Sequence, residues 1–188
     1  MDYKNDVEKC LEVLNNGGII LYPTDTIWGL GCDATNEKAV EKIVELKKRP
    51  AEKSFVVLVA DEKDVLQYTA SPDIAIFDYL ETQNKPVTVI YEQALGIADN
   101  AIAKDGSIAI RICIEPFCKA LIKRFRKPIL STSANFSGKI APSIFPEIDD
   151  TIIRGVNYAV HYRRTDLKPA QASKIIRWNN GELIVIRE

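Results

Sequence analysis

Apolar residues in the first part of the chain alternate between helical spacing and strand spacing. Val7, Cys10, Leu11 and Leu14 fall at i, i+3, i+4 and i+7, which predicts an amphipathic helix. An Asn-Asn-Gly-Gly stretch ends it, because asparagine and glycine tolerate positive φ. Residues 19–22 then form a short, continuously apolar run that predicts a buried strand.

The same pattern continues to the C-terminus. It predicts a helix capped by Asn36 and closed by Pro50, a strand at 55–60, a helix opened by Ser71-Pro72, strands at 87–91, 107–113 and 158–162, a helix at 117–125, and strands at 172–178 and 183–187. Asn-Gly within residues 179–182 is a strong hairpin signal. Residues 139–170 are the least regular and are expected to form a flap. We therefore predict an α/β fold, a single domain over residues 1–188 with a mixed twisted sheet flanked by helices.

Composition narrows the class of protein. The chain has 188 residues and a net charge of −1, from 25 basic and 26 acidic side chains, which argues against a strongly basic nucleic-acid binder. Its four cysteines form no Cys-x-x-Cys pair and His161 is its one histidine, so a zinc site is not expected. Buried, reduced thiols, a polar acidic N-terminus and no apolar run of membrane-spanning length predict a cytoplasmic protein.

Two loops rich in hydroxyl, amide and glycine groups are the first functional signal. Residues 22–31 and 131–138 each follow an apolar run, and α/β sheets often build ligand sites where strands end. Between them lie Lys47, Lys48, Arg49 and Lys53. These cations suit phosphate binding, but cations in the last turn of a helix also stabilise its C-terminus without any ligand.

Arg111 is the sharper candidate. Within 107–113 it alternates with three isoleucines and shares its face with Ser107 and Ala109. It is either a solvent-facing sheet residue or a guanidinium with room to bind a carboxylate or phosphate through two hydrogen bonds. The chain has neither a Walker motif nor Gly-x-Gly-x-x-Gly. The residues alone therefore indicate an anion or nucleotide pocket and no particular reaction.

Several motifs, in order, resemble those of the YrdC-like threonylcarbamoyl-AMP synthases. They are residues 18–26 with Gly29-Leu30, the Lys-x-Arg at 47–49, the Ser-x-Asn at 133–135, residues 172–176 and Arg187. The resemblance runs nearly end to end and implies a mixed α/β sheet with a deep, positively lined concave cavity. The chain stops at Glu188, which resembles the short, single-domain bacterial type.

The resemblance implies a nucleotidyltransferase that joins L-threonine, bicarbonate or CO2, and ATP. The threonine amine forms a carbamate, a carbamate oxygen attacks the α-phosphorus, and pyrophosphate leaves. Mg2+ is expected with the triphosphate, with no metal held by the protein itself. Downstream proteins would transfer the threonylcarbamoyl group to tRNA, and weak binding of tRNA or double-stranded RNA is a further expectation.

The family motifs also imply roles for individual residues. Threonine would be held by Thr26, Arg111, Ser133 and Ser173; ATP by Arg49, Lys53, Ser107, Asn135, Ser143 and Arg187; and Lys47 and Arg49 would be catalytic, with Lys47 stabilising phosphate charge. The chain departs from the family at Trp28, where tyrosine is usual, and at Leu58, where some members have a histidine. The alternative is a fold paralogue that acts as an RNA-binding or ribosome-assembly protein. The intact Lys-x-Arg and Ser-x-Asn favour the synthase.

Overall fold

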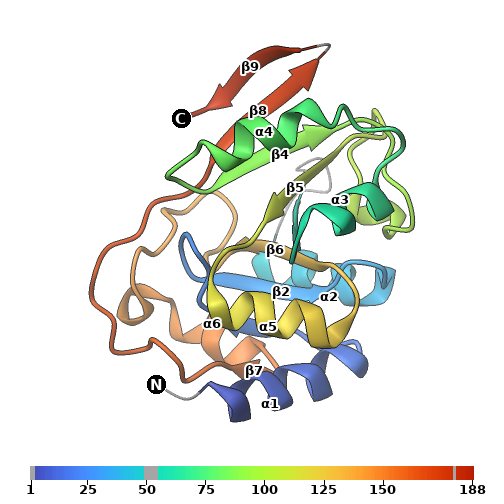
Figure 1. The fold of residues 1–188 in the computed structure, drawn as a ribbon. Helices are drawn as coiled ribbons and strands as arrows, with labels where there is room; N and C mark the ends of the chain where they lie inside the picture. Colours follow the sequence, from blue (N-terminus) through green and yellow to red (C-terminus); the bar gives the residue numbers. More distant parts are fainter. Residues whose placement is uncertain (1–2, 49–54, 180) are drawn as a thin grey trace.

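A computed structural model describes residues 3–48, 55–179 and 181–188 (Figure 1). Within these ranges one sheet has nine strands in the order β7-β1-β2-β6-β3-β5-β4-β8-β9. The strands are β1 (Ile20–Tyr22), β2 (Gly29–Asp33), β3 (Val56–Val59), β4 (Val87–Tyr91), β5 (Ile108–Ile112), β6 (Ile129–Ser133), β7 (Tyr158–Ala159), β8 (Lys174–Asn179) and β9 (Glu182–Arg187).

The sheet is mixed, as predicted. Strand β3 runs parallel to β5, β4 parallel to β8 and β1 parallel to β7, whereas the other neighbours are antiparallel. The predicted C-terminal hairpin is confirmed as β8–β9. The predicted strand at 158–162 is shorter, because only its first two residues pair with β1. Strand β2 was not predicted, since Gly29–Asp33 reads as part of a loop.

The helices are α1 (Lys4–Asn15), α2 (Glu37–Lys47), α3 (Glu62–Tyr68), α4 (Ala75–Glu81), α5 (Pro116–Phe125) and α6 (Asp150–Gly155), with short 3-10 turns at Asp99–Ala101 and Phe145–Glu147. The predicted cap is confirmed, because the Asn36 side chain accepts a hydrogen bond from the Ala39 amide at 3.2 Å. Helix α2 ends at Lys47, and the residue that caps it, Lys48, has a φ of 49°.

The predicted helix start at Ser71-Pro72 is wrong. Helix α4 begins at Ala75, and Asp73 accepts a hydrogen bond from the Ala75 amide at 3.0 Å. Ser71 has a φ of 47°, which is incompatible with the extended backbone of a serine N-cap. The cause is tertiary: Thr69 forms a β-bridge with Ala94, so the chain must turn before it can enter a helix.

The irregular segment at 139–170 is partly held against the body of the protein. One carboxylate does much of this, because buried Asp6 on α1 accepts hydrogen bonds from the Tyr158 hydroxyl at 2.6 Å and from the amides of His161 and Tyr162 at 3.1 and 2.8 Å. The segment also contains α6 and β7. The part of this segment from α6 to Tyr162 therefore contains regular elements and is bonded to α1.

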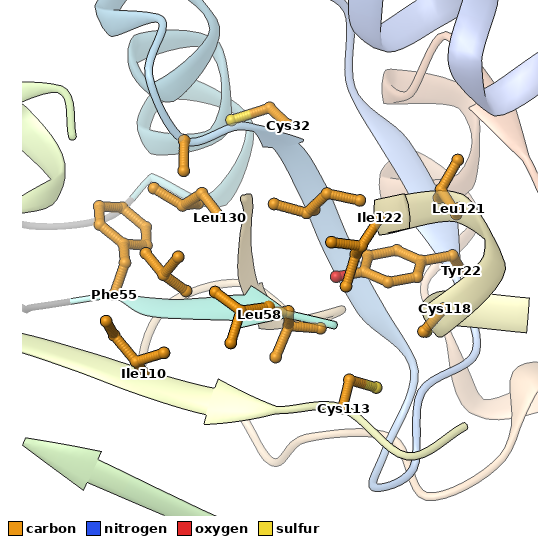
Figure 2. Close-up of a cluster of buried hydrophobic side chains, with 14 of the residues drawn as sticks. Tyr22, Cys32, Phe55, Leu58, Ile110, Cys113, Cys118, Leu121, Ile122 and Leu130 are labelled. Atoms are coloured by element: carbon orange, nitrogen blue, oxygen red, sulfur yellow. The ribbon is translucent and has the colours of Figure 1, made fainter. Parts of the chain in front are cut away.

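The core lies between the sheet and its helices (Figure 2). Tyr22, Leu58 and Leu130 are fully buried there, and the Tyr22 hydroxyl donates to Ser131 Oγ at 2.9 Å. All four cysteines are free and buried, as predicted, and burial raises the pKa of the Cys118 thiol well above its usual value. No helix among the described residues is long and apolar enough to cross a membrane.

Gly31 is expected to tolerate no side chain. A Cβ there would lie 2.6 Å from a ring carbon of Tyr22 and 3.0 Å from Ile129. We expect Gly31→Ala to lower the free energy of unfolding by about 1–3 kcal/mol, the usual cost of overpacking a core, as measured by chemical denaturation.

Gly155→Ala is the matched control. The nearest obstacle there is the end of the Leu46 side chain, a half-buried and rotatable group. Its cost should be clearly smaller. Equal losses in the two variants would mean that the Tyr22 contact does not constrain position 31.

Candidate functional site

A pocket of about 380 Å³ opens on one face of the sheet. Its lining comes from the loop after β1, from strands β2, β3, β4, β5, β6, β8 and β9, and from the segments before β3 and β8. Arg111 and Ala109 of β5 both line it, whereas Ile108 and Ile110 are buried on the opposite side. The predicted alternation of β5 is therefore confirmed, with the arginine on the pocket face.

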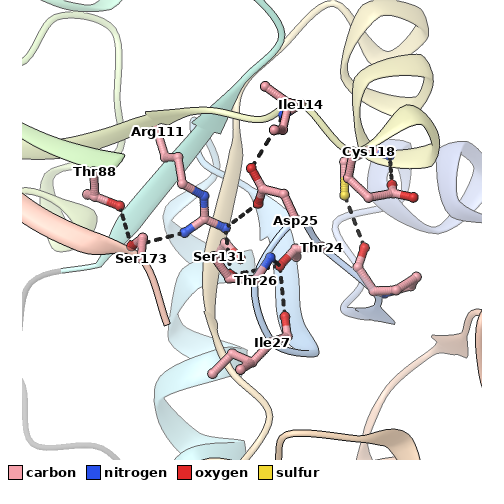
Figure 3. Close-up of polar contacts among 12 residues, drawn as sticks. Thr24, Asp25, Thr26, Ile27, Thr88, Arg111, Ile114, Cys118, Ser131 and Ser173 are labelled. Atoms are coloured by element: carbon pink, nitrogen blue, oxygen red, sulfur yellow. Dashed lines mark hydrogen bonds and ion pairs between the residues drawn. The ribbon is translucent and has the colours of Figure 1, made fainter. Parts of the chain in front are cut away.

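Arg111 is the charged centre of this face (Figure 3). Arg111 is only 5% exposed to solvent. Nη2 donates to Thr26 Oγ1 at 3.2 Å, and Nη1 lies 3.5 Å from Ser173 Oγ. Nε is buried and has no hydrogen-bond partner among the described residues. Buried polar groups are nearly always bonded, so this guanidinium has spare donor capacity for a ligand.

Asp25 is the residue that sequence reasoning missed. Its Oδ1 lies 3.1 Å from Arg111 Nη2, an ion pair without hydrogen-bond geometry, and its side chain is 3% exposed. Its Oδ2 accepts the Ile114 amide at 3.3 Å (Figure 3). An acidic residue between two threonines in a loop looks like a turn former, so only the fold shows that it faces β5.

A chain of hydroxyl groups surrounds the guanidinium. Thr26 Oγ1 lies 2.9 Å from Thr24 Oγ1, and Ser173 Oγ lies 2.8 Å from Thr88 Oγ1. Thr88 is fully buried on β4, so it fixes the position of the Ser173 hydroxyl beside Arg111. The predicted residues Thr26, Arg111 and Ser173 are therefore brought together, although they come from distant parts of the sequence.

Ser133 and Asn135 form the turn at the end of β6. Ser133 Oγ donates to Asn135 Oδ1 at 2.6 Å, and Asn135 Nδ2 donates to the Lys139 carbonyl at 2.6 Å. Lys47 is 1% exposed and donates to the carbonyls of Ser133 and Asn135. Ser133 is among the residues that line the pocket, whereas Lys47 is not.

The other residues that were predicted for the site lie at different distances from the pocket. Arg187 lines the pocket, and its Nη2 donates to the Ser173 carbonyl at 2.8 Å. Ser107 lies at the start of β5, with its hydroxyl donating to Asp105 at 2.6 Å. Ser143 lines a small hollow that shares Thr24, Thr26 and Trp28 with the pocket. Arg49 and Lys53 lie outside the described residues.

The electrostatics of the pocket favour an anion. Partial burial, together with the positive charge of Arg111, lowers the pKa of Arg187. Two guanidinium groups that face one pocket repel each other, and an anion between them relieves that repulsion. Their planar, fixed donors suit carboxylate and phosphate oxygens. The pocket can therefore orient an anion, with hydroxyl groups beside it.

Comparisons with known proteins show the family of the chain. The family model Sua5_yciO_yrdC, described as "Telomere recombination", matches residues 12–188. The threonylcarbamoyl-AMP synthase of Coxiella burnetii (strain RSA 493) is 31% identical over 184 residues, which cover 94% of this chain and 98% of the relative.

Solved structures show the same fold. Escherichia coli YciO has a TM-score of 0.81 at 23% identity, covering 98% of this chain and 89% of its own. P. abyssi Sua5 in complex with L-threonine has a TM-score of 0.81 at 20% identity, covering 96% of this chain and 53% of its own. The chain thus spans about half of that Sua5 chain and nearly all of the Coxiella relative.

The buried ion pair should be costly to break. We expect Asp25→Asn to lower the free energy of unfolding by about 3–5 kcal/mol, because it leaves the Arg111 charge buried without its partner. Asp150→Asn is the matched control: Asp150 pairs with Arg154 at 3.5 Å, but both side chains are about 80% exposed. It should change stability little, since exposed pairs contribute little. Similar stability losses for the two substitutions, measured by denaturant titration, would contradict this account of Asp25.

Proposed function

The chain belongs to the Sua5/YciO/YrdC family, and we infer that it is a threonylcarbamoyl-AMP synthase, a nucleotidyltransferase that uses L-threonine and ATP. Relatives that carry this name align over most of the chain. The observation that carries the inference is Arg111, a buried guanidinium that faces a pocket, has hydroxyl neighbours and has an unbonded Nε.

Threonine is assigned to the Arg111 end of the pocket. A carboxylate accepts two hydrogen bonds from a guanidinium fork, and Arg111 has donors to give. The hydroxyls of Thr26 and Ser173 lie beside it, and Ser133 lines the same pocket. These groups suit an amino acid that carries its own hydroxyl. The Sua5 structure with L-threonine, which shares this fold, supports the assignment.

ATP is assigned to the part of the pocket near Arg187 and the Ser-x-Asn turn. Arg187 adds positive charge at the pocket, and Asn135 lies in the turn next to Ser133. Arg49, Lys53, Ser107 and Ser143 complete the assignment from the family motifs. Lys47 and Arg49 are assigned to catalysis. The bonds of Lys47 to the Ser133 and Asn135 carbonyls give it a second role, which is to hold that turn in place.

The reaction needs positioning and charge neutralisation, with no covalent enzyme intermediate. The threonine amine attacks the carbon of CO2 and loses a proton, or attacks the carbon of bicarbonate with loss of water, and either route yields a carbamate. A carbamate oxygen then attacks the α-phosphorus of ATP, and pyrophosphate departs. Holding the reactants in line removes much of the entropic cost, and fixed cations stabilise the developing phosphate charge.

Mg2+ is proposed to arrive with the triphosphate. The described residues contain no group of three or more His, Cys, Asp or Glu that could hold a metal ion. The product would pass to proteins that modify tRNA in the cytoplasm, and weak binding of tRNA or double-stranded RNA is proposed to accompany this transfer. A single domain over residues 1–188 is proposed to carry the whole activity.

Pyrophosphate release should require threonine and bicarbonate together. The expected result is release of pyrophosphate and formation of the threonylcarbamoyl adenylate, detected by mass spectrometry, only when all three substrates are present. Equal ATP consumption without threonine would indicate a general ATPase instead. Salt-dependent affinity for tRNA with no turnover would favour the RNA-binding alternative.

Arg111→Lys should separate the two substrates. The substitution keeps the charge beside Asp25 but loses the fork, so we expect threonine affinity to fall roughly 10- to 100-fold, equivalent to about 1.5–3 kcal/mol, with little change for ATP. Calorimetric titration of each substrate measures this. Arg124→Lys is the control, since Arg124 is half exposed on α5. Loss of ATP affinity with threonine affinity intact would make Arg111 a phosphate ligand.

A further inference from the structure

Strand β9 forms one edge of the sheet and is exposed along its whole length. Four consecutive apolar residues, Leu183 to Ile186, are 38–55% exposed. The strand contains neither proline nor lysine. Such an edge presents unpaired backbone groups and apolar side chains together, which is the combination that recruits another strand.

The opposite edge of the sheet is protected. Strand β7 has only two residues, both half-buried. Arg164 donates to the carbonyls of Ala159 and Val160 at 2.5 and 2.8 Å, so these groups are not open to another strand. The contrast within one sheet indicates that the exposure of β9 reflects an unfilled pairing site.

The register of the hairpin determines which side chains of β9 share a face. Ile184 pairs with Arg177, and Arg187 pairs with Ile175, two residues earlier on β8. Directly paired residues point to the same side, so Ile184 and Arg187 lie on one face. In a regular strand, residues three apart point to opposite faces. Ile184 and Arg187 share a face because the register shift between Ile175 and Ile176 inserts one extra residue into β9. Glu182, two residues before Ile184, lies on this face as well.

We propose that β9 pairs antiparallel with β9 of a second copy of this chain, around a two-fold axis at Ile184. In this register Ile184 faces Ile184 of the second copy, and Leu183 faces Val185. Glu182 comes opposite the bulged end of the neighbouring strand, on the same face as Arg187 of the second copy. The strand is thus complementary to itself in apolar contacts and in charge, as a two-fold interface requires.

The proposed pairing also reaches the functional pocket. Ile186 and Arg187 line the pocket, and Arg187 is bonded to the Ser173 carbonyl beside Arg111. Glu182 of the second copy would stand at the rim of this pocket, next to a guanidinium. Each copy would therefore complete one wall of the other's site. The proposal rests on the edge strand alone and does not depend on the reaction.

Sedimentation velocity over a wide range of protein concentrations tests the pairing. The wild type is expected to show a monomer–dimer equilibrium. Ile184→Lys places two lysines against each other at the axis and should raise the dissociation constant at least about tenfold, which corresponds to 1.4 kcal/mol. Leu66→Lys is the matched control, because Leu66 is 48% exposed and lies on α3, which packs on β3 and β5. Circular dichroism and thermal unfolding check that each variant is folded.

Charge exchange tests the register. Glu182→Arg and Arg187→Glu should each weaken the dimer, and the two together should restore it. A protein that stays monomeric at every concentration would overturn the proposal and leave this edge to a strand of another protein. A dimer that resists Ile184→Lys would place the interface elsewhere. A dimer that Ile184→Lys dissolves but the combined charge exchange does not restore would overturn the register.

Discussion

The buried positive charge of Arg111 is the constraint on which the site depends. Burying an isolated ion is expensive, so the surrounding groups must replace water around the guanidinium. Asp25 supplies the opposite charge at 3.1 Å, and Thr26 and Ser173 supply hydroxyl oxygens. These groups come from the β1–β2 loop and the segment before β8, at opposite ends of the sequence. When these segments fold onto β5, their oxygen atoms therefore replace the water around the Arg111 guanidinium.

This arrangement assigns different tasks to the two arginines. Arg111 and Asp25 together are close to neutral, so Arg111 can attract a distant anion only weakly but can orient a nearby one through fixed donors. Arg187 forms no ion pair within its own chain among the described residues, and it is bonded to a carbonyl. The pocket thus combines two kinds of guanidinium. The one neutralised by Asp25 can select an anion by its geometry, and the other can attract an anion by its charge. A small carboxylate substrate and a polyphosphate substrate need these two kinds of site.

The sequence predicts the parts of the site that follow from local periodicity. Strand alternation is enough to place Arg111 beside Ala109 and opposite the isoleucines, and the structure confirms it. The family resemblance implies that Thr26 and Ser173 share one site, and both line the pocket. Asp25 lies inside the motif at residues 18–26 but was given no role, because its partner is 86 residues away in the sequence. The Ser71-Pro72 error has a similar origin, since the bridge between Thr69 and Ala94 overrides a local helix signal. In both cases a contact between residues far apart in the sequence decides the structure, and a local sequence pattern does not reveal such a contact.

The same reasoning explains why an exposed apolar edge can persist beside a functional pocket. An edge strand could be protected by lysine or proline, but β9 must also carry Arg187 into the pocket and keep regular pairing with β8. The bulge meets both needs: it returns Arg187 to the pocket face and leaves Leu183 to Ile186 as an uninterrupted apolar run. Proline at a position whose N–H pairs with β8 would remove a ladder hydrogen bond, and lysine next to Arg187 would add charge at the pocket rim. Covering the edge with another strand is a further solution, and a second copy offers a strand whose apolar run and charges complement it.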